Sequence, residues 1–183
     1  MTKYLFAAAI LMVVCASRAV DLKLIPQGTK WITEVDLKTL GESETGRYLK
    51  QKAAAGVPGE KQVRSFAEQT GIDFARDVAS FAFCGSGTGR NAGFMILKGA
   101  WNVDTVAATL PKAKNFVTKE YGKHVVMSWE DRGPRFACLV DNKLAFFASD
   151  EAQLLLALDT RDGRKPHAAN DAAFANFNPV AKK

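Results

Sequence analysis

The sequence RFACLVDNKLAFFASDEAQLLLALD, residues 135 to 159, is the strongest structural pattern in this chain of 183 residues. Two apolar runs flank the polar tripeptide 141–143, which predicts a β-hairpin closed by an Asx-type turn. The second run leads into a leucine-rich helix with Ser149 as its N-cap, and Asp150 and Glu151 suit its positive end. A unit of two strands and a helix predicts an antiparallel sheet with helices packed on it.

Other segments show the same kind of local pattern. Strand patterns occupy residues 31–37, 78–84, 93–98, 115–120 and 123–129, and helical spacing occupies residues 44–55, 59–70 and 103–110. This order predicts an α+β fold, with a mainly antiparallel sheet of about six or seven strands and helices packed on one face.

Both faces of the predicted sheet are apolar. One face is assigned to the helices and carries Phe81, Phe83, Phe94, Ile96, Phe136, Val140, Leu144 and Phe146. The other face then carries Met95, Leu97, Ala137, Leu139, Ala145 and Phe147. A sheet face in water should alternate with polar residues, so we expect this second face to be covered. Its candidate interface residues are Met95, Leu97, Leu139 and Phe147.

The N-terminus has the pattern of a secretory signal peptide over residues 1–19. Lys3 precedes an apolar run at 4–16, and small residues follow before the polar chain begins. We expect cleavage after Ala19, with Ala16 as the alternative. The apolar run is shorter than the roughly 20 residues that cross a bilayer, so no transmembrane segment is expected after cleavage. The predicted location is therefore periplasmic or extracellular.

Cleavage would leave one α+β domain over residues 20–165 and a polar C-terminal tail over 166–183. Loss of Lys3 and Arg18 with the leader lowers the formal net charge from +6 to +4. Export and this mild charge argue against a nucleic-acid partner. They suit either a solvated surface or attraction to anionic lipid or polysaccharide.

The cysteines give three alternatives. Cys15 lies in the leader, where a lipoprotein signal would want a smaller residue before it than Val14. Cys84 and Cys138 lie in predicted strands and form a candidate disulfide if those strands are neighbours. Otherwise they are two packed thiols, which the absence of a CxxC spacing also allows.

The sequence predicts no catalytic residue, no metal ligand and no cofactor site. His124 and His167 are the only histidines, and neither has a metal-binding spacing such as HExxH. Two pairs of nearby carboxylates could act as a general acid and a general base: Glu34 with Asp36, and Glu130 with Asp131. No GxSxG elbow occurs, and the glycine-rich segment 85–91 precedes a strand, so it predicts a hairpin loop and no phosphate site.

Lysines and aromatic residues alternate along the segment 112–129, which contains Phe116, Tyr121 and Trp129. This mixture of charged and aromatic side chains is compatible with binding an anionic polymer. An ordinary exposed strand pair is the other interpretation.

Four segments together resemble a group of exported bacterial proteins of unknown function. They are IPQGTKWITEVDLKTL (25–40), TGIDFARDVASFAF (70–83), LKGAWNVDTV (97–106) and LAFFASDEAQLLLALD (144–159). The resemblance covers most of residues 25–160 and implies the fold and export, without implying a reaction. Members often contain the unit twice, and this chain has one copy, which favours a homodimer as the substitute.

Three hypotheses of function follow. The first is an exported, non-catalytic module that binds itself or another envelope protein through the second sheet face; Leu139→Asp would then separate a dimer without unfolding it. The second is a carrier of an apolar or lipid ligand. The third is an enzyme of a type without a recognisable motif.

Overall fold

The computed structural model describes residues 20–44, 46–47, 60–87 and 92–174 of the chain. The predicted signal peptide, 1–19, and most of the predicted helix 44–55 lie outside these residues. The remaining predicted elements are compared with the structure below.

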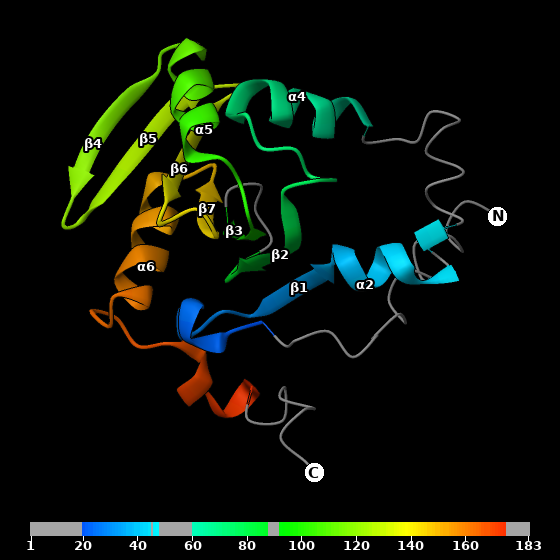
Figure 1. Cartoon of the computed structure of the whole chain (residues 1–183). Coiled ribbons are helices and arrows are strands. Elements are labelled where there is room, and N and C mark those ends of the chain that lie inside the picture. The colour runs from blue at the N-terminus through cyan, green and yellow to red at the C-terminus, as the bar shows by residue number, and fades with distance from the viewer. Residues whose placement is uncertain (1–19, 45, 48–59, 88–91, 175–183) are drawn as a thin grey trace, which may run out of the picture.

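A seven-stranded sheet forms the middle of the molecule (Figure 1). Its order is β1-β2-β3-β7-β6-β5-β4, and every neighbouring pair is antiparallel. The α+β class and the antiparallel sheet are therefore confirmed. The strands are β1 (Trp31–Asp36), β2 (Val78–Gly85), β3 (Gly93–Gly99), β4 (Val117–Tyr121), β5 (His124–Glu130), β6 (Pro134–Leu139) and β7 (Leu144–Ala148).

In the described ranges, four α-helices and short 3₁₀ turns are attached to this sheet. The helices are α2 (Leu37–Glu42), α4 (Glu60–Thr70), α5 (Val103–Thr109) and α6 (Glu151–Arg161). The 3₁₀ turns are η2 (Leu22–Leu24), η3 (Leu110–Lys112), η4 (Ala168–Asn170) and η5 (Ala172–Phe174). Side-chain caps begin α2 and α5: Asp36 accepts from the backbone N–H of Thr39, and Asn102 accepts from that of Thr105.

The β6–β7–α6 unit forms as its sequence predicts, with one correction. Asp141 Oδ1 accepts from the backbone N–H groups of Lys143 and Leu144, which closes the Asx turn. The N-cap of α6 is Asp150, whose carboxylate accepts from Ala152 N–H at 2.8 Å. Ser149 is therefore not the cap, and its hydroxyl instead accepts from Arg135.

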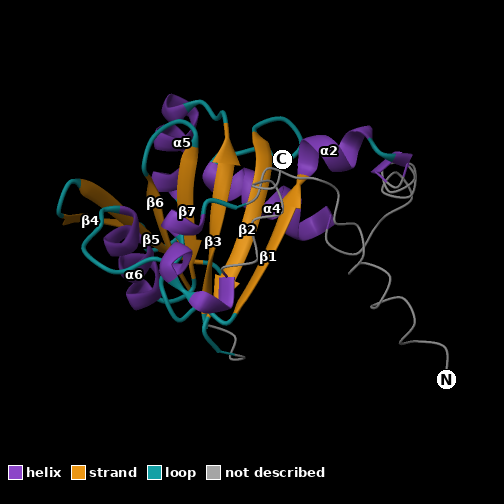
Figure 2. Cartoon of the chain, turned by 90° about the horizontal axis from the view of Figure 1, so that it is seen from below, coloured by secondary structure: helices purple, strands orange, loops and turns teal. Residues whose placement is uncertain are grey.

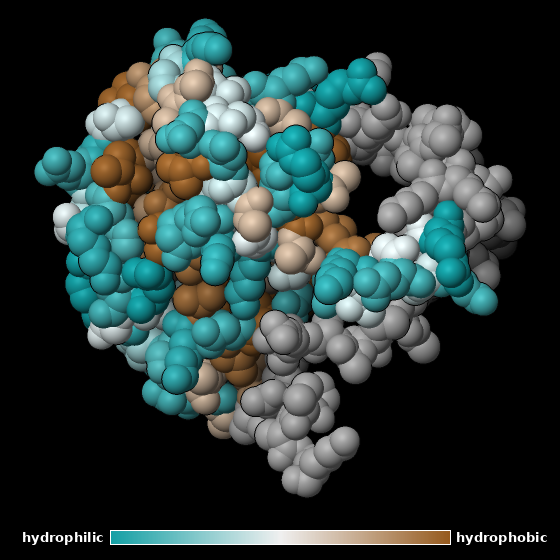
Figure 3. Space-filling model, in the orientation of Figure 1, coloured by the Kyte–Doolittle hydropathy of each residue, from teal (hydrophilic) through white to brown (hydrophobic). Residues whose placement is uncertain are grey.

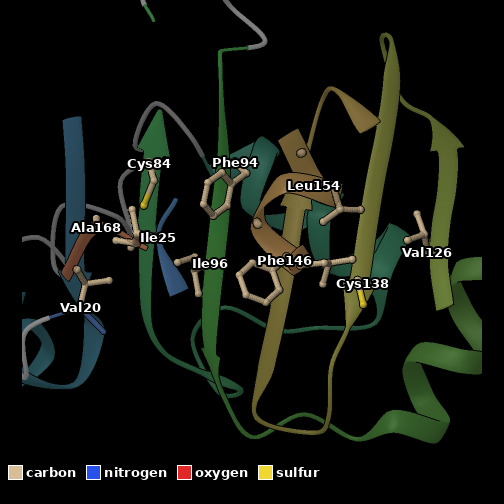
Figure 4. Packing of buried hydrophobic residues seen from close by; sticks show 14 residues of the cluster. Val20, Ile25, Cys84, Phe94, Ile96, Val126, Cys138, Phe146, Leu154 and Ala168 are labelled. Carbon is tan, nitrogen blue, oxygen red and sulfur yellow. The ribbon is translucent and has the colours of Figure 1, made fainter. Parts of the chain in front are cut away.

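The first face of the sheet packs against α6, η2 and η4, and we call this cluster the α6 core. Phe146 at its centre is fully buried and lies against Leu154 and Leu158 of the helix. Figure 4 shows these side chains converging from β2, β3, β7, β6 and α6. Val20, Ile25 and Ala168 are buried in the same apolar cluster, so its burial also fixes these segments against the sheet.

The second face packs against α4, α5 and η3, and we call this cluster the α5 core. Leu97 and Phe147 of the sheet meet Val106 and Leu110 from α5 and η3. Helices therefore cover both faces of the sheet (Figure 2), and the expectation of helices on one face is corrected. The physical reason is that neighbouring residues such as Phe146 and Phe147 point to opposite faces, and both are apolar.

The predicted face assignment holds for β3, β6 and β7 and fails for β2. Phe81 pairs with Leu97, and Phe83 pairs with Met95, so both rings lie on the α5 side. The smaller Ala82 and Cys84 take the α6 side, where the N-terminal segment packs closely against the strand.

Part of the segment that the sequence predicts as a polar tail is folded. Residues 166–174 belong to the folded domain: His167 forms a β-bridge with Pro26, and Ala168 is fully buried in the α6 core. His167 is thus a structural residue at the start of η4 and not a solvated one. Residues 175–183 lie outside the described part.

Candidate functional site

A groove of about 580 Å³ lies on the second face, where β1 and β3 begin and β7 ends, and we call it the α4 groove. Its wall on the helix side is Ser65, Phe66 and Gln69 of α4. Its floor is largely apolar and includes Phe83, Met95 and Phe147. The apolar hollow between α4 and α2 that Figure 3 shows is separate from this groove, because no residue of α2 lines the groove.

A row of aromatic rings forms the floor and extends beyond the groove. Successive rings meet edge to face with centroids 5.0 to 6.5 Å apart, in the order Phe83, Phe81, Phe74, Phe66, Phe147 and Trp129. This geometry is the one that aromatic pairs prefer. Phe83 is the outer end of the row, and 43% of its surface is exposed. The row therefore runs from solvent at Phe83 to the core at Trp129.

Trp31 is fixed at the outer end of the groove by its own hydrogen bond. Its Nε1–H donates to the carbonyl of Gly87 at 2.8 Å. The indole lies directly on Gly85, where a Cβ atom would be 2.5 Å from the ring. Glycine at position 85 is therefore what lets this ring lie flat against β2.

The inner end of the groove is polar. Trp129 Nε1–H donates to Gln69 Oε1 at 3.2 Å, and Gln69 Nε2 donates to Ser65 Oγ at 2.9 Å. These bonds hold α4 against β5.

Two arginines stand at the rim beside this polar end. Arg135 donates to Ser149 Oγ at 3.1 Å, and its Nε lies 3.9 Å from Asp131. Arg132 is exposed. Its backbone has a φ of 52°, which is part of the turn that precedes β6. Two cations against one carboxylate leave this rim positively charged, which suits an anionic group.

The four candidate interface residues lie together on the second face, but the protein covers much of them itself. Leu97 is fully buried and Phe147 is 7% exposed, both in the α5 core. Met95 and Leu139 are half-buried and pack on the same cluster. Met95 and Phe147 line the groove.

The candidate disulfide does not form, and the cysteines are packed thiols. Cys84 lies on β2 and Cys138 on β6, with β3 and β7 between them (Figure 4). Three strand spacings separate them by about 14 Å, well beyond disulfide reach. Burial raises the pKa of Cys84 to about 12 and that of Cys138 to about 11, so both stay protonated and unreactive.

His124 and Asp162 form a buried pair at the C-terminal end of α6. The Nε2 atom of His124 lies 2.9 Å from Asp162 Oδ2, and Lys123, Arg161 and Arg164 also reach this carboxylate. The cluster ties the β4–β5 hairpin to the helix. It lies outside the α4 groove.

The two pairs of adjacent carboxylates are separated by their environments. Asp36 caps α2, while Glu34 is half-buried beside the α6 core. Glu130 binds Lys114, and Asp131 faces Arg135. Asp36, Glu130 and Asp131 therefore each have a structural partner.

The lysines of the β4–β5 region are also paired with carboxylates. Lys114 meets Glu130, Lys119 meets Glu151, and Lys123 meets Asp162. The hairpin is confirmed as an exposed strand pair whose positive charge is partly neutralised. Part of the glycine-rich loop, 88–91, lies outside the described residues.

Within the described ranges, no set of three or more His, Cys, Asp or Glu side chains is arranged to hold a metal ion. None of the helices in the described part combines the length and apolar character required to cross a bilayer.

Sequence reasoning missed Trp31, Gln69, Arg132 and Arg135 as groove residues. They come from three separate segments, and only the fold brings them together. The available signal was weak: the Gly133-Pro134 turn marks where β6 begins, and Arg132 and Arg135 lie on either side of it.

The structure itself defines the chain as an α+β protein with a seven-stranded antiparallel sheet. No protein-family model and no curated protein matches it. A solved structure of TP0453, crystal form IV, is similar with a TM-score of 0.49 and 5% identity. The match covers 80% of this chain and 54% of that one, so the chain spans about half its length. A likeness at this level carries no argument about function.

Proposed function

We propose that this chain is an exported, non-catalytic binding protein whose α4 groove holds an apolar chain with an anionic head. The observation that carries the proposal is a groove with an aromatic row that opens to solvent at Phe83 at one end and with Arg132 and Arg135 at the rim of the other end.

The size and lining of the groove support a small amphiphile. Its volume of about 580 Å³ falls within the roughly 300 to 1,000 Å³ of small-molecule sites. Phe83, Met95 and Phe66 offer a continuous apolar surface, and burying it against an acyl chain is favourable at about 25 cal/mol per Å². The polar groups gather at one end, which would orient the ligand.

The rim supports a negative head group over a neutral or positive one. Arg135 is half-buried and held by Ser149, so its guanidinium is positioned before any ligand binds. Arg132 stands exposed nearby in the same lining. A carboxylate or phosphate there would receive charge-assisted hydrogen bonds.

Self-association through the second face is less well supported. A dimer interface needs exposed apolar residues, and Leu97 and Phe147 are already buried by α4 and α5. The open part of the face is concave, which favours insertion of a chain over contact between two flat copies.

Binding of palmitate to the mature protein, followed by fluorescence of Trp31 and Trp129 at concentrations below micelle formation, tests the proposal. We expect one palmitate per chain. Phe83→Asp should weaken palmitate at least about tenfold, because the ligand would then cover a charge. The matched control is Val125→Asp on β5, since Val125 is 51% exposed and lies outside the groove.

The head-group preference is tested with hexadecanol and hexadecyltrimethylammonium in place of palmitate. Arg135→Gln should weaken palmitate by about tenfold and leave hexadecanol nearly unchanged. Equal losses for Phe83→Asp and Val125→Asp, or no binding of any of the three probes, would show that the groove is not a ligand site. A protein that dimerises and binds no probe would support the self-association hypothesis instead.

A further inference from the structure

The α4 groove runs across the strands, along a row of residues contributed by neighbouring strands. At its outer end, Trp31 of β1 pairs with Gly85 of β2, and Gly85 pairs with Gly93 of β3. At its inner end, Trp129 of β5 pairs with Arg135 of β6. All of these residues except Gly85 line the groove. A ligand in the groove therefore lies across the strands, and the spacing between strands limits its length.

Trp31 closes the outer end of this row. Its strand, β1, is the outermost strand on this side of the sheet (Figure 2). The indole lies over Gly85, where a Cβ atom would be 2.5 Å from the ring, and its Nε1–H donates to the carbonyl of Gly87. The ring is therefore held in place before any ligand binds. Gly93, the next residue in the row, has no side chain, so the groove stays open as far as the indole.

The distance between the two ends of the row corresponds to a defined length of hydrocarbon. The strand order β2-β3-β7-β6 places three strand spacings, about 14 Å, between Gly85 and Arg135. An extended hydrocarbon advances about 1.25 Å per carbon, because its C–C bonds of about 1.52 Å alternate in direction. A carboxylate bound at Arg135 therefore has room for a chain of about 10 to 12 carbons before that chain reaches the indole.

We propose that Trp31 sets the length of acyl chain that the α4 groove buries, and that saturated carboxylates of about 10 to 12 carbons fill it completely. This inference rests on the proposed function, since it places the anionic head at Arg135. Longer acids such as palmitate bind as well. Their carbons beyond this length turn away from the floor into solvent, where they bury no further apolar surface and add no affinity.

Calorimetric titration of the mature protein with saturated carboxylates of increasing length, from octanoate to octadecanoate, tests this inference at concentrations below micelle formation. In the wild type, affinity should rise about twofold to fourfold with each added methylene up to dodecanoate and then stay level. This break in the series is measured without any substitution, so the test does not depend on how a variant folds.

Trp31→Ala should move the break by one strand spacing, about 4.8 Å or about four carbons, because the chain could then continue over Gly85 toward β1. Hexadecanoate should bind this variant at least about tenfold more tightly than the wild type. Octanoate is too short to reach the indole and should bind both proteins equally. The matched control is Val117→Ala on β4, the opposite edge strand, since Val117 is 59% exposed and lies outside the groove.

The same titrations separate failure of this inference from failure of the proposed function. Three results would overturn the role of Trp31 and leave the groove as a ligand site. They are an affinity that rises steadily to octadecanoate in the wild type, a break that stays at dodecanoate in Trp31→Ala, and an equal loss of affinity at every length in that variant. Absence of binding at every length in the wild type would overturn both proposals.

Discussion

Phe146→Ala is expected to lower the free energy of unfolding by about 3 to 5 kcal/mol. Phe146 is fully buried, its ring lies 6.2 Å from that of Phe94, and it pairs with Ile96 on β3 and Cys138 on β6. Its removal leaves a cavity beneath α6, between strands that cannot move together because their ladders fix their spacing. Urea unfolding at pH 7 measures the loss.

The neighbouring residue is the informative control. Phe147→Ala should also destabilise the protein, but Phe147 belongs to the aromatic row and lines the α4 groove. It should therefore weaken palmitate binding at temperatures where the variant is folded, whereas Phe146→Ala should leave palmitate binding unchanged. Equal effects of the two variants on palmitate would contradict the division of the sheet into two functionally different faces.

Asp162→Asn is expected to cost about 2 to 4 kcal/mol at pH 7. Its side chain is 7% exposed and meets Lys123, His124 and Arg161 at 3.1 Å or less. Burial alone would raise the pKa of Asp162, but hydrogen bonds from those three residues outweigh it and lower the pKa to about 2. The substitution removes the negative charge and leaves the surrounding cations uncompensated.

The same carboxylate makes stability depend on pH in acid. The pKa is lower in the folded chain than its ordinary value of 3.8, so this stabilisation is present above about pH 4. It is lost as pH falls through about 2. Urea unfolding at several pH values should show the wild type and Asp162→Asn converging in this window. Asp104→Asn, at an exposed position in the first turn of α5, should change stability little at any pH. A constant gap between wild type and Asp162→Asn down to pH 2 would exclude this assignment.

The strands and the helices α4, α5 and α6 were largely predictable because they depend on local signals, whereas α2 was not predicted. The Asx turn at Asp141, the cap at Asn102 and the alternation in β1 act within a few residues. The choice between Ser149 and Asp150 as cap was not predictable, since both side chains suit the position. The structure gives Ser149 a second use, with Arg135, which is distant in sequence.

Features that depend on packing between distant segments were missed or wrong. The assumed alternation of side chains assigned Phe81 and Phe83 to the face of the α6 core, but that core at β2 receives the N-terminal segment and needs small residues. The role of residues 166–168 follows from their pairing with Pro26 and Gln27, which no local pattern shows.

The groove itself depends on the same kind of long-range placement. The apolar second face was predicted, including Met95 and Phe147, and its partial coverage was not. Whether it stays open depends on how far α4 and α5 extend over the sheet. That is set by tertiary packing and not by the period of either helix.

Native and denaturing mass spectrometry of the mature protein, purified from the compartment to which it is exported, tests the central claim most directly. We predict a monomer that carries one non-covalent adduct of lipid-like mass under native conditions and loses it on denaturation. The Phe83→Asp protein, purified in parallel, should carry little or none, while Val125→Asp should retain it. A bare monomer, or a dimer without an adduct, would contradict the proposal that the α4 groove is a site for an apolar ligand.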